Sequence, residues 1–334
     1  MRIVRSIALL LLFLPAALPS QSPPASGKKV LGIEDYTRWR SIAGSELSAD
    51  GKWVVYGLRQ VNTLPTDAKP VLRLRNVATG TETEIVDASQ PSFSPDGKWL
   101  TYLVETQPKK PATPAKDSAV APPAVTPTPA TPPAAGGRGA GGNQVTRRWE
   151  LRELATGKVQ VWQDIASATF SPTARHLVLR RRPATPATGG APAGGANAAR
   201  GLDAIVHDLT TGRSLFLGSV DEIGFNKSGE LLAYTVDATV RDVNGVYLAT
   251  LSTGRIEPLD VDTLRYARLT WNDGGTGLAV LKGREVEKMR ERSNRLVVFG
   301  NLAATRTPAI LDPATTAGFP KGFVVTERTT LEWS

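Results

Sequence analysis

The sequence predicts an all-β fold, a β-propeller of four-stranded blades, and three observations lead to this expectation. A turn-and-strand signature built around Ser-Pro-Asp-Gly recurs five times along the 334 residues. A Thr-Gly pair, typical of a β-hairpin, follows each of the first four copies. Glycine (31 residues) and proline (25 residues) are frequent, which favours short strands and tight turns over a helical bundle.

The signature is clearest in its first two copies, Leu47–Tyr56 and Phe93–Tyr102, which begin 46 residues apart. Serine, proline and glycine at these spacings favour a type I turn, and we expect a positive φ at Gly97. Three weaker copies follow at Phe170–Leu179, Phe225–Tyr234 and Trp271–Val280. A strand follows each turn. Two of its apolar positions are two residues apart and so lie on one face of the strand, which we expect to be buried. These positions are Val54, Leu100, Leu177, Leu232 and Leu278, then Tyr56, Tyr102, Leu179, Tyr234 and Val280.

The Thr-Gly pairs predict the third and fourth strands of each unit. Each pair lies between two short strand patterns, with glycine able to take the positive φ that a hairpin requires. Gly80, Gly157 and Gly212 each precede the next signature by 13 residues, so the unit repeats regularly. One unit therefore holds four strands, as a propeller blade does. The pairs are Thr79-Gly80, Thr156-Gly157, Thr211-Gly212 and Thr253-Gly254.

The repeats predict an incomplete propeller over residues 30–334. We count about five blades, and Leu331–Ser334 resembles the start of a sixth signature, so we expect a longer parent protein. A five-bladed ring closed by the N-terminal segment is the alternative. Two segments rich in proline, alanine and glycine, about 107–143 and 183–200, are expected to be disordered inserts, because they bury too little apolar surface to fold. The charged, helix-prone segment Arg284–Asn294 is expected to decorate the fifth blade.

The N-terminus predicts export. Arg2 and Arg5 precede an apolar run from Ile7 to Leu18, so residues 1–20 are expected to be a signal peptide and 21–29 a linker. The run is too short to span a bilayer, so no stable membrane insertion is expected after cleavage. Cleavage lowers the formal charge from +9 to +7. The remaining basic residues are scattered, and we expect no nucleic-acid partner and a periplasmic or extracellular location.

The residue inventory predicts no catalytic, cofactor-binding or metal-binding residues in this chain. There are no cysteines, which excludes disulfides, thiolate nucleophiles and cysteine-based zinc sites, and there is no G-x-S-x-G nucleophile elbow. His176 takes the place of Trp53 and Trp99 in the repeat and is expected to be a packed strand residue. His207 is expected to be structural. Two motifs carry little weight: the glycine-rich run 137–142 has no flanking strand and helix, and the sequon Asn226-Lys227-Ser228 lies in a repeat turn.

The opening of the repeat region resembles a known family. Ile33–Ile42, with Asp35-Tyr36-x-x-Trp39, followed by Leu47–Tyr56, is similar to the start of secreted bacterial members of the prolyl oligopeptidase family of serine peptidases. Their acylaminoacyl-peptidase-like and dipeptidyl-peptidase-like branches look most similar, although TolB-type propellers share the Ser-Pro-Asp-Gly repeats.

The resemblance implies a function. In that family a propeller precedes an α/β-hydrolase domain with a Ser-Asp-His triad and admits only short or unfolded peptides. No triad residue maps onto this chain, and Glu285 and Glu287 do not form the adjacent glutamate pair that binds substrate N-termini in some members. The sequence thus predicts the substrate-gating propeller of an exported serine peptidase, not catalytic by itself. The alternative is a non-enzymatic periplasmic TolB-like propeller that acts as a protein-interaction scaffold.

Overall fold

The computed structural model describes residues 32–61, 70–106, 145–183, 199–289 and 291–334. The predicted signal peptide, the linker, the first insert and most of the second insert lie outside these residues. The described chain is all-β apart from two short 3-10 helices, η1 (Ile33–Arg38) and η2 (Arg241–Val243).

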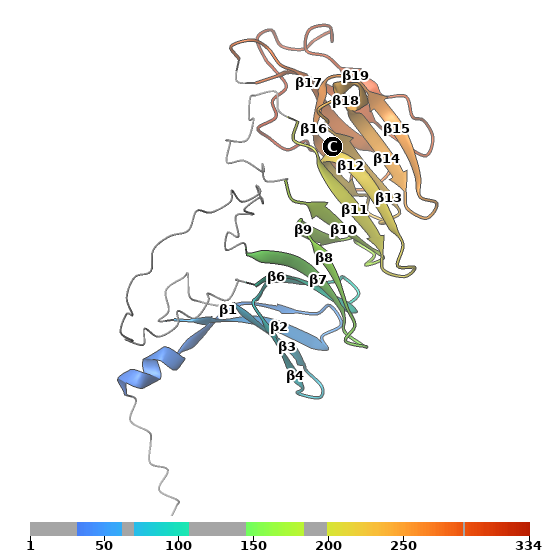
Figure 1. The fold of residues 1–334 in the computed structure, drawn as a ribbon. Coiled ribbons are helices and arrows are strands. Elements are labelled where there is room, and N and C mark those ends of the chain that lie inside the picture. The colour runs from blue at the N-terminus through green and yellow to red at the C-terminus, as the bar shows by residue number, and fades with distance from the viewer. Residues whose placement is uncertain (1–31, 62–69, 107–144, 184–198, 290) are drawn as a thin grey trace, which may run out of the picture.

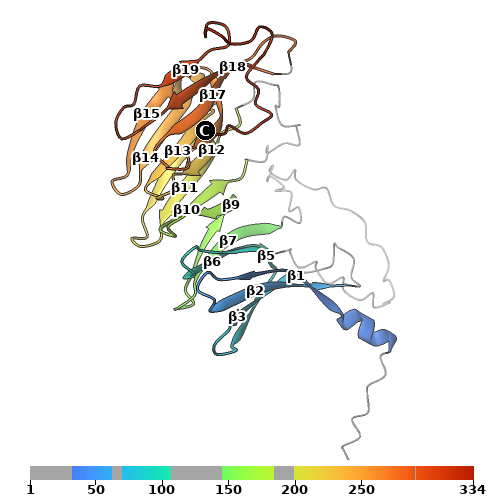
Figure 2. The same ribbon diagram turned by 180° about the vertical axis from the view of Figure 1, so that it is seen from behind.

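Nineteen strands form four antiparallel sheets within the described residues. The sheets lie one after another in chain order, from the blue β1–β4 sheet to the orange β16–β19 sheet (Figures 1 and 2). The first two sheets contain β1 (Arg40–Leu47), β2 (Trp53–Gln60), β3 (Val71–Asn76) and β4 (Glu82–Val86), then β5 (Ala88–Phe93), β6 (Trp99–Thr106), β7 (Thr146–Glu153) and β8 (Val159–Gln163). The third contains β9 (Ile165–Phe170), β10 (His176–Arg181), β11 (Leu202–Asp208), β12 (Ser214–Phe225), β13 (Leu231–Val236), β14 (Gly245–Thr250) and β15 (Arg255–Val261). The fourth contains β16 (Arg265–Trp271), β17 (Leu278–Arg284), β18 (Ser293–Phe299) and β19 (Ala309–Leu311).

The seven-stranded third sheet joins two sequence repeats through one strand. The first part of β12 pairs with β11 and its last part pairs with β13, with a register shift between Val220 and Ile223. Ser219 has φ 51° at this junction. Asp87 (φ 56°) and Asp164 (φ 57°) occupy the same place before β5 and β9, where a new sheet begins. We number the repeats as units 1 to 5, with β12 shared by units 3 and 4.

The Asp-Gly turns form as the sequence predicts. In the second unit the Ser94 hydroxyl donates to Asp96 (2.6 Å) and accepts the Trp99 amide (2.9 Å), and Gly97 has φ 68°. The predicted positive φ is confirmed. The same arrangement recurs in the first unit, where Ser48 bonds to Asp50 and to the Trp53 amide. Each turn closes because a short polar side chain satisfies the amide that opens the next strand.

Successive units pack their apolar faces against each other. In units 2 to 5 the predicted core positions are buried, as at Leu100 and Tyr102 (both 0% exposed). Leu100 and Tyr102 pack with Val55 of unit 1, and the other three interfaces repeat this arrangement. Val54 and Tyr56 differ, because their face of unit 1 has no sheet against it among the described residues, and both are only half-buried. The prediction of one buried face therefore holds for four of the five units.

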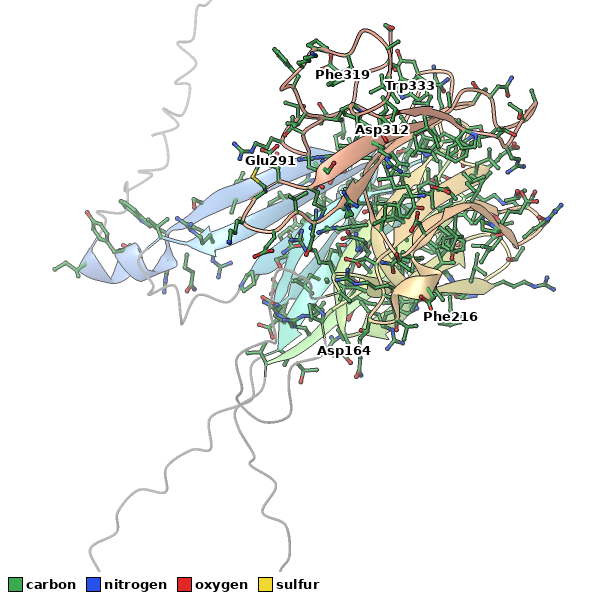
Figure 3. The ribbon with its side chains drawn as sticks, turned by 90° about the horizontal axis from the view of Figure 1, so that it is seen from above. Asp164, Phe216, Glu291, Asp312, Phe319 and Trp333 are labelled. Carbon is green, nitrogen blue, oxygen red and sulfur yellow. The ribbon has the colours of Figure 1, made fainter. Side chains whose placement is uncertain are left out.

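Two ends of the sheets differ in character. One end, the turn end, carries the Asp-Gly turns and the Thr-Gly hairpins, as antiparallel pairing requires. The opposite end, the loop end, carries the links between the second and third strands of each unit. The segment after β19 runs along the last sheet, and Figure 3 shows Asp312, Phe319 and Trp333 on the side away from Phe216 of β12. No helix among the described residues is long and apolar enough to cross a membrane.

Candidate functional site

A charged cavity lies at the loop end, between units 4 and 5. Its walls come from the end of β17, the start of β16, and the links that follow β13, β15 and β17. The segment Arg284–Asn294, which is helix-prone by sequence, forms no helix in its described residues. Strand β17 ends at Arg284, turns and irregular structure follow, and β18 begins at Ser293. The cavity has a volume of about 290 Å³ and is lined by Asp237, Arg241, Asn244, Thr263, Leu264, Arg265, Gly283, Arg284, Glu285 and Arg292.

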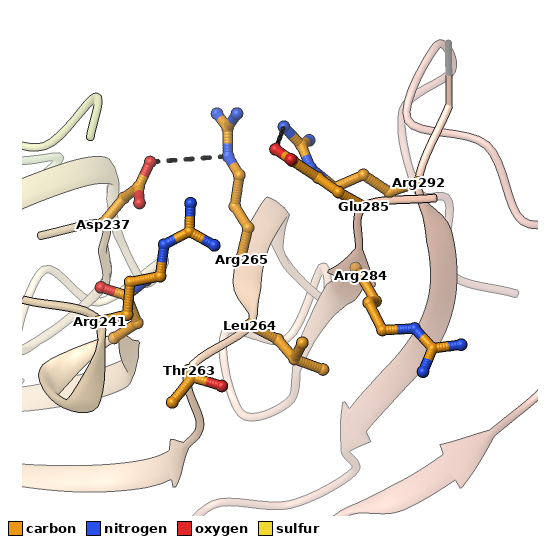
Figure 4. A pocket seen from close by; sticks show the side chains of 10 residues that line it. Asp237, Arg241, Thr263, Leu264, Arg265, Arg284, Glu285 and Arg292 are labelled. Carbon is orange, nitrogen blue, oxygen red and sulfur yellow. Dashed lines mark ion pairs between the residues drawn. The ribbon is translucent and has the colours of Figure 1, made fainter. Parts of the chain in front are cut away.

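Arg265 is held in this cavity by two carboxylates. It is the first residue of β16, and its Nη2 donates to Asp221 Oδ2 (2.8 Å). Its Nε lies 3.9 Å from Asp237 Oδ2, which is an ion pair beyond hydrogen-bond distance (Figure 4). Both carboxylates come from unit 4, so Arg265 links unit 5 to unit 4 at the loop end. Such charge-assisted contacts orient a guanidinium with little loss of its other donors.

Arg292 is held on the opposite wall. Its Nη1 donates to both carboxylate oxygens of Glu327 at 2.9 Å, and its Nη2 lies 3.8 Å from Glu285 Oε1. Figure 4 shows Arg241, Arg265 and Arg292 turned toward one another and Arg284 turned away. Glu327 belongs to the segment after β19, so this segment holds Arg292 in place.

A second and larger cavity of about 640 Å³ adjoins the first and shares Glu285 and Arg292 with it. Together the two cavities are lined by eight basic and five acidic side chains, an excess of three positive charges. The basic residues are Arg200, Arg241, Arg265, Arg268, Arg284, Lys288, Arg292 and Arg328, and the acidic residues are Asp237, Glu285, Glu287, Glu291 and Glu327.

The paired cavities present mainly charged hydrogen-bonding groups. Their lining contains no serine, cysteine or histidine, and Thr263 is its one hydroxyl side chain. Guanidinium groups bind carbonyl and carboxylate oxygens well, because they present several N–H donors in fixed directions. Within the described residues, no group of three or more His, Cys, Asp or Glu side chains is placed to hold a metal ion.

The two histidines are both buried, at the turn end, away from these cavities. His176 is a packed residue at the start of β10, as predicted. His207 Nδ1 lies 3.0 Å from Ser214 Oγ, but its Nε2 is buried without a partner. A catalytic triad needs a carboxylate on that second nitrogen, so this pair is not a triad. Burial lowers the pKa of both histidines, which keeps the imidazoles neutral.

The sequon is structural in the folded chain. Asn226 is 5% exposed; its Nδ2 donates to the Gly275 carbonyl (3.2 Å) and its Oδ1 accepts the Leu231 amide (3.0 Å). The bond to the Leu231 amide repeats the role of Ser94. The bond to the Gly275 carbonyl ties unit 4 to unit 5. The glycine-rich run 137–142 lies outside the described residues. The structure places Glu285 between the two cavities, whereas Glu287 is 89% exposed.

The sequence pattern does not predict the arginine-lined cavities. Arg241, Arg265 and Arg292 stand 24 and 27 residues apart and form no motif. The one available signal is the charged segment Arg284–Asn294. The expectation that this chain holds no catalytic, cofactor-binding or metal-binding residue stays a prediction.

Comparison with family models and with curated proteins finds no match. Among solved structures, the chain is similar to the acylaminoacyl peptidase of Pyrococcus horikoshii, with a TM-score of 0.40 and 13% identity, over 79% of this chain and 39% of that one. It is also similar to the β-propeller domain of the Trilobed protease from Pyrococcus furiosus (TM-score 0.39, 13% identity, 79% of this chain and 69% of that one). TolB from Acinetobacter baumannii gives a TM-score of 0.31 and 14% identity, over 82% of this chain and 56% of that one.

The chain thus spans well under half the length of the acylaminoacyl peptidase, at 39%. All three TM-scores are below 0.5.

Proposed function

We propose that this chain is the N-terminal, substrate-gating propeller of an exported serine peptidase that acts on short peptides. The catalytic α/β-hydrolase domain would lie outside residues 1–334. The observation that carries the proposal is the opening Asp35-Tyr36-x-x-Trp39, followed directly by the Ser-x-Asp-Gly repeats, which together resemble the secreted prolyl oligopeptidase family.

The geometry of this opening segment supports a contact with a further domain. The Asp35 carboxylate accepts the Gly32 amide (3.0 Å) and so holds η1 in shape. Tyr36 and Trp39 stack with ring centroids 4.5 Å apart, yet they remain 50% and 42% exposed. Figure 1 shows η1 projecting away from the sheets. An ordered, exposed aromatic pair is a good apolar contact for another protein surface.

The half-buried face of unit 1 supports an incomplete ring. Val54 and Tyr56 occupy positions that are buried in every later unit, as at Leu100 and Tyr102. A sheet from a further blade would cover this face in the same way. We therefore propose a partial propeller at 30–334 with about five blades and the start of a sixth. From the N-terminal sequence we also propose a signal peptide at 1–20 and a linker at 21–29. The charged cavities at the loop end would then orient peptide carbonyl and carboxylate groups on their way to the catalytic domain.

The second candidate is a periplasmic TolB-like scaffold without enzymatic activity. One observation favours it: the paired cavities are lined mostly by charged side chains, as a polar surface for a protein partner would be. The two candidates differ in the sequence expected C-terminal to the repeats. A peptidase requires a hydrolase domain with a G-x-S-x-G serine, and a scaffold does not.

The test is the full coding sequence, followed by activity of its product. We expect two or three further blades and then a G-x-S-x-G motif, and we expect the full product to cleave short chromogenic peptides and not folded proteins. The matched control is the full product with that motif's serine changed to alanine, which should fold and be inactive. A stop codon after one further blade would reject the peptidase and favour the scaffold.

A further inference from the structure

His176 departs from the repeat at a position where units 1, 2 and 4 place an apolar side chain and unit 5 has Gly277. Trp53 and Trp99 occupy this position in units 1 and 2, and each packs in the core between its own unit and the next. Leu231 takes the position in unit 4 and packs in the same way. In unit 3 a cavity of about 270 Å³ lies beside the imidazole, between units 3 and 4, at the turn end.

The inner wall of this cavity carries two polar groups, His176 and Asp208, with no hydrogen bond between them. The His176 side chain is 5% exposed, its Nδ1 has no partner, and its Nε2 lies 3.7 Å from Asp208 Oδ2. Arg175 Nη2 lies 3.6 Å from the same oxygen. Both distances exceed hydrogen-bond range. The other oxygen of Asp208 accepts the amides of Thr210 (2.8 Å) and Thr211 (2.9 Å), so Oδ2 is the oxygen left for a ligand.

The rest of the lining combines hydroxyl groups, apolar side chains and two arginines. Arg175 and Arg213 are exposed, whereas the apolar residues are buried or half-buried. The hydroxyl groups come from both hairpins that border the cavity, one in unit 3 and one in unit 4. They belong to Thr211, Ser214, Ser252 and Thr253, and the apolar surface is that of Val206, Leu215 and Leu251.

These charges restrict the ligand class. Asp208 Oδ2 repels an anion at the inner wall, and Arg175, 3.6 Å from the same oxygen, offsets the attraction of this carboxylate for a cation. A neutral hydroxyl group avoids both penalties, because it donates to a carboxylate and also bonds to an imidazole nitrogen. A gap of 3.7 Å between His176 Nε2 and Asp208 Oδ2 lets one hydroxyl oxygen bond to both atoms. Burial lowers the pKa of His176, so the imidazole is neutral and fits such a ligand.

We propose that the cavity at His176 and Asp208 binds a neutral, hydroxyl-rich small molecule, a monosaccharide or polyol. Hydroxyl groups of the ligand bond to Asp208 and His176, and its carbon skeleton packs on Leu215 and Leu251. The volume suits a molecule smaller than a drug-sized ligand, whose pockets begin at about 300 Å³. This site is separate from the loop-end cavities and does not depend on the proposed peptidase function.

The test is titration of this chain with D-glucose and glycerol, followed by amide and histidine-ring nitrogen signals in NMR spectra. Acetate and methylammonium serve as charged probes of similar or smaller size. We expect glucose or glycerol to give saturable shifts at residues 175–176, 208–215 and 251–254 with a Kd of about 1 mM, and to shift the His176 ring nitrogens. The charged probes should leave these signals unchanged.

Two variants separate binding from folding. His176→Trp restores the side chain of units 1 and 2, so it should fill the cavity and weaken binding at least tenfold without lowering the melting temperature. Asp208→Asn keeps the oxygen that accepts the two turn amides and removes the charge, and it should weaken binding about fivefold. If His176→Trp does not fold, Asp208→Asn and the histidine-ring shifts decide the test alone.

Three results would overturn the proposal. The first is no shift at these residues with glucose or glycerol at about 50 mM, well above the expected Kd. The second is unchanged binding by a folded His176→Trp or by Asp208→Asn. The third is saturable binding of acetate or methylammonium in place of the neutral probes, which would reject the ligand class.

Discussion

Replacing Gly97 with alanine tests how the turns of neighbouring units contact each other. Gly97 has φ 68°, and a Cβ added there would lie 2.9 Å from Asp50 Oδ1 and 3.0 Å from Asp50 Cγ in unit 1. The Asp50 carboxylate cannot move away freely, because it accepts the Ser48 hydroxyl (2.7 Å) and the Lys52 amide (3.2 Å). The substitution therefore adds backbone strain and an overlap between units.

Gly51 is the matched control. It occupies the same turn position in unit 1 with φ 70°, but a Cβ there meets nothing within 4 Å. Gly51→Ala should cost only the left-handed backbone strain, about 1–2 kcal/mol of unfolding free energy. Gly97→Ala adds the overlap, and overpacking costs at least about 1 kcal/mol, so we expect a total of about 2–3 kcal/mol.

The assay is denaturant unfolding of both variants and the parent chain, followed by tryptophan fluorescence. The difference between the two variants isolates the contact between units 1 and 2, because the strain is common to both. Equal destabilisation by Gly97→Ala and Gly51→Ala would refute the reasoning. It would mean that the turns of adjacent units do not touch in solution.

Three further predictions concern the core and its titrating groups. Leu100→Ala, at a fully buried position, should lower the unfolding free energy by about 2–5 kcal/mol, whereas Leu47→Ala, 60% exposed, should change it by less than about 0.5 kcal/mol; similar losses would contradict the assigned core. Burial lowers the pKa of His176 and His207, so these histidines take up protons at a higher pH in the unfolded chain than in the folded one. The unfolding free energy should therefore fall as the pH drops below about 6.5. Denaturation midpoints of the double glutamine variant should fall less between pH 7 and pH 5, and an equal fall would count against buried neutral histidines. Burial raises the pKa of Tyr102 to about 12, so this tyrosine ionises at a lower pH in the unfolded chain, and the unfolding free energy should fall above about pH 10. Tyr102→Phe should reduce this loss. An unchanged alkaline profile in that variant would argue against the raised pKa.

The turns and strands were predictable from the sequence because their causes are local. Ser94, Asp96 and Gly97 close their turn through bonds that span at most five residues. The alternation of Leu100 and Tyr102 likewise places both on one strand face whatever lies opposite. The repeat spacing then predicted the four-stranded unit, including the hairpin at each Thr-Gly pair.

Other features depend on which units meet. Asp87, Asp164 and Ser219 all have a positive φ. A new sheet begins after Asp87 and after Asp164, whereas at Ser219 strand β12 continues and joins two units in one sheet. The positive φ therefore does not predict where a sheet ends. The burial of Val54 depends on whether a sheet covers its face. These outcomes are set by packing between units, which no local pattern encodes.

The candidate sites show the same division. The sequence identified His176 as a packed strand residue in the place of a tryptophan, but the cavity beside it depends on the hairpin of the next unit. Arg265 and Arg292 meet across another cavity only because Asp221 and Glu327, 44 and 35 residues away, hold them there. The repeated unit follows from the sequence, because hydrogen bonds within turns and alternation along strands act at short range. The tertiary structure alone decided which charges and gaps face one another, because contacts between units join residues far apart in the chain.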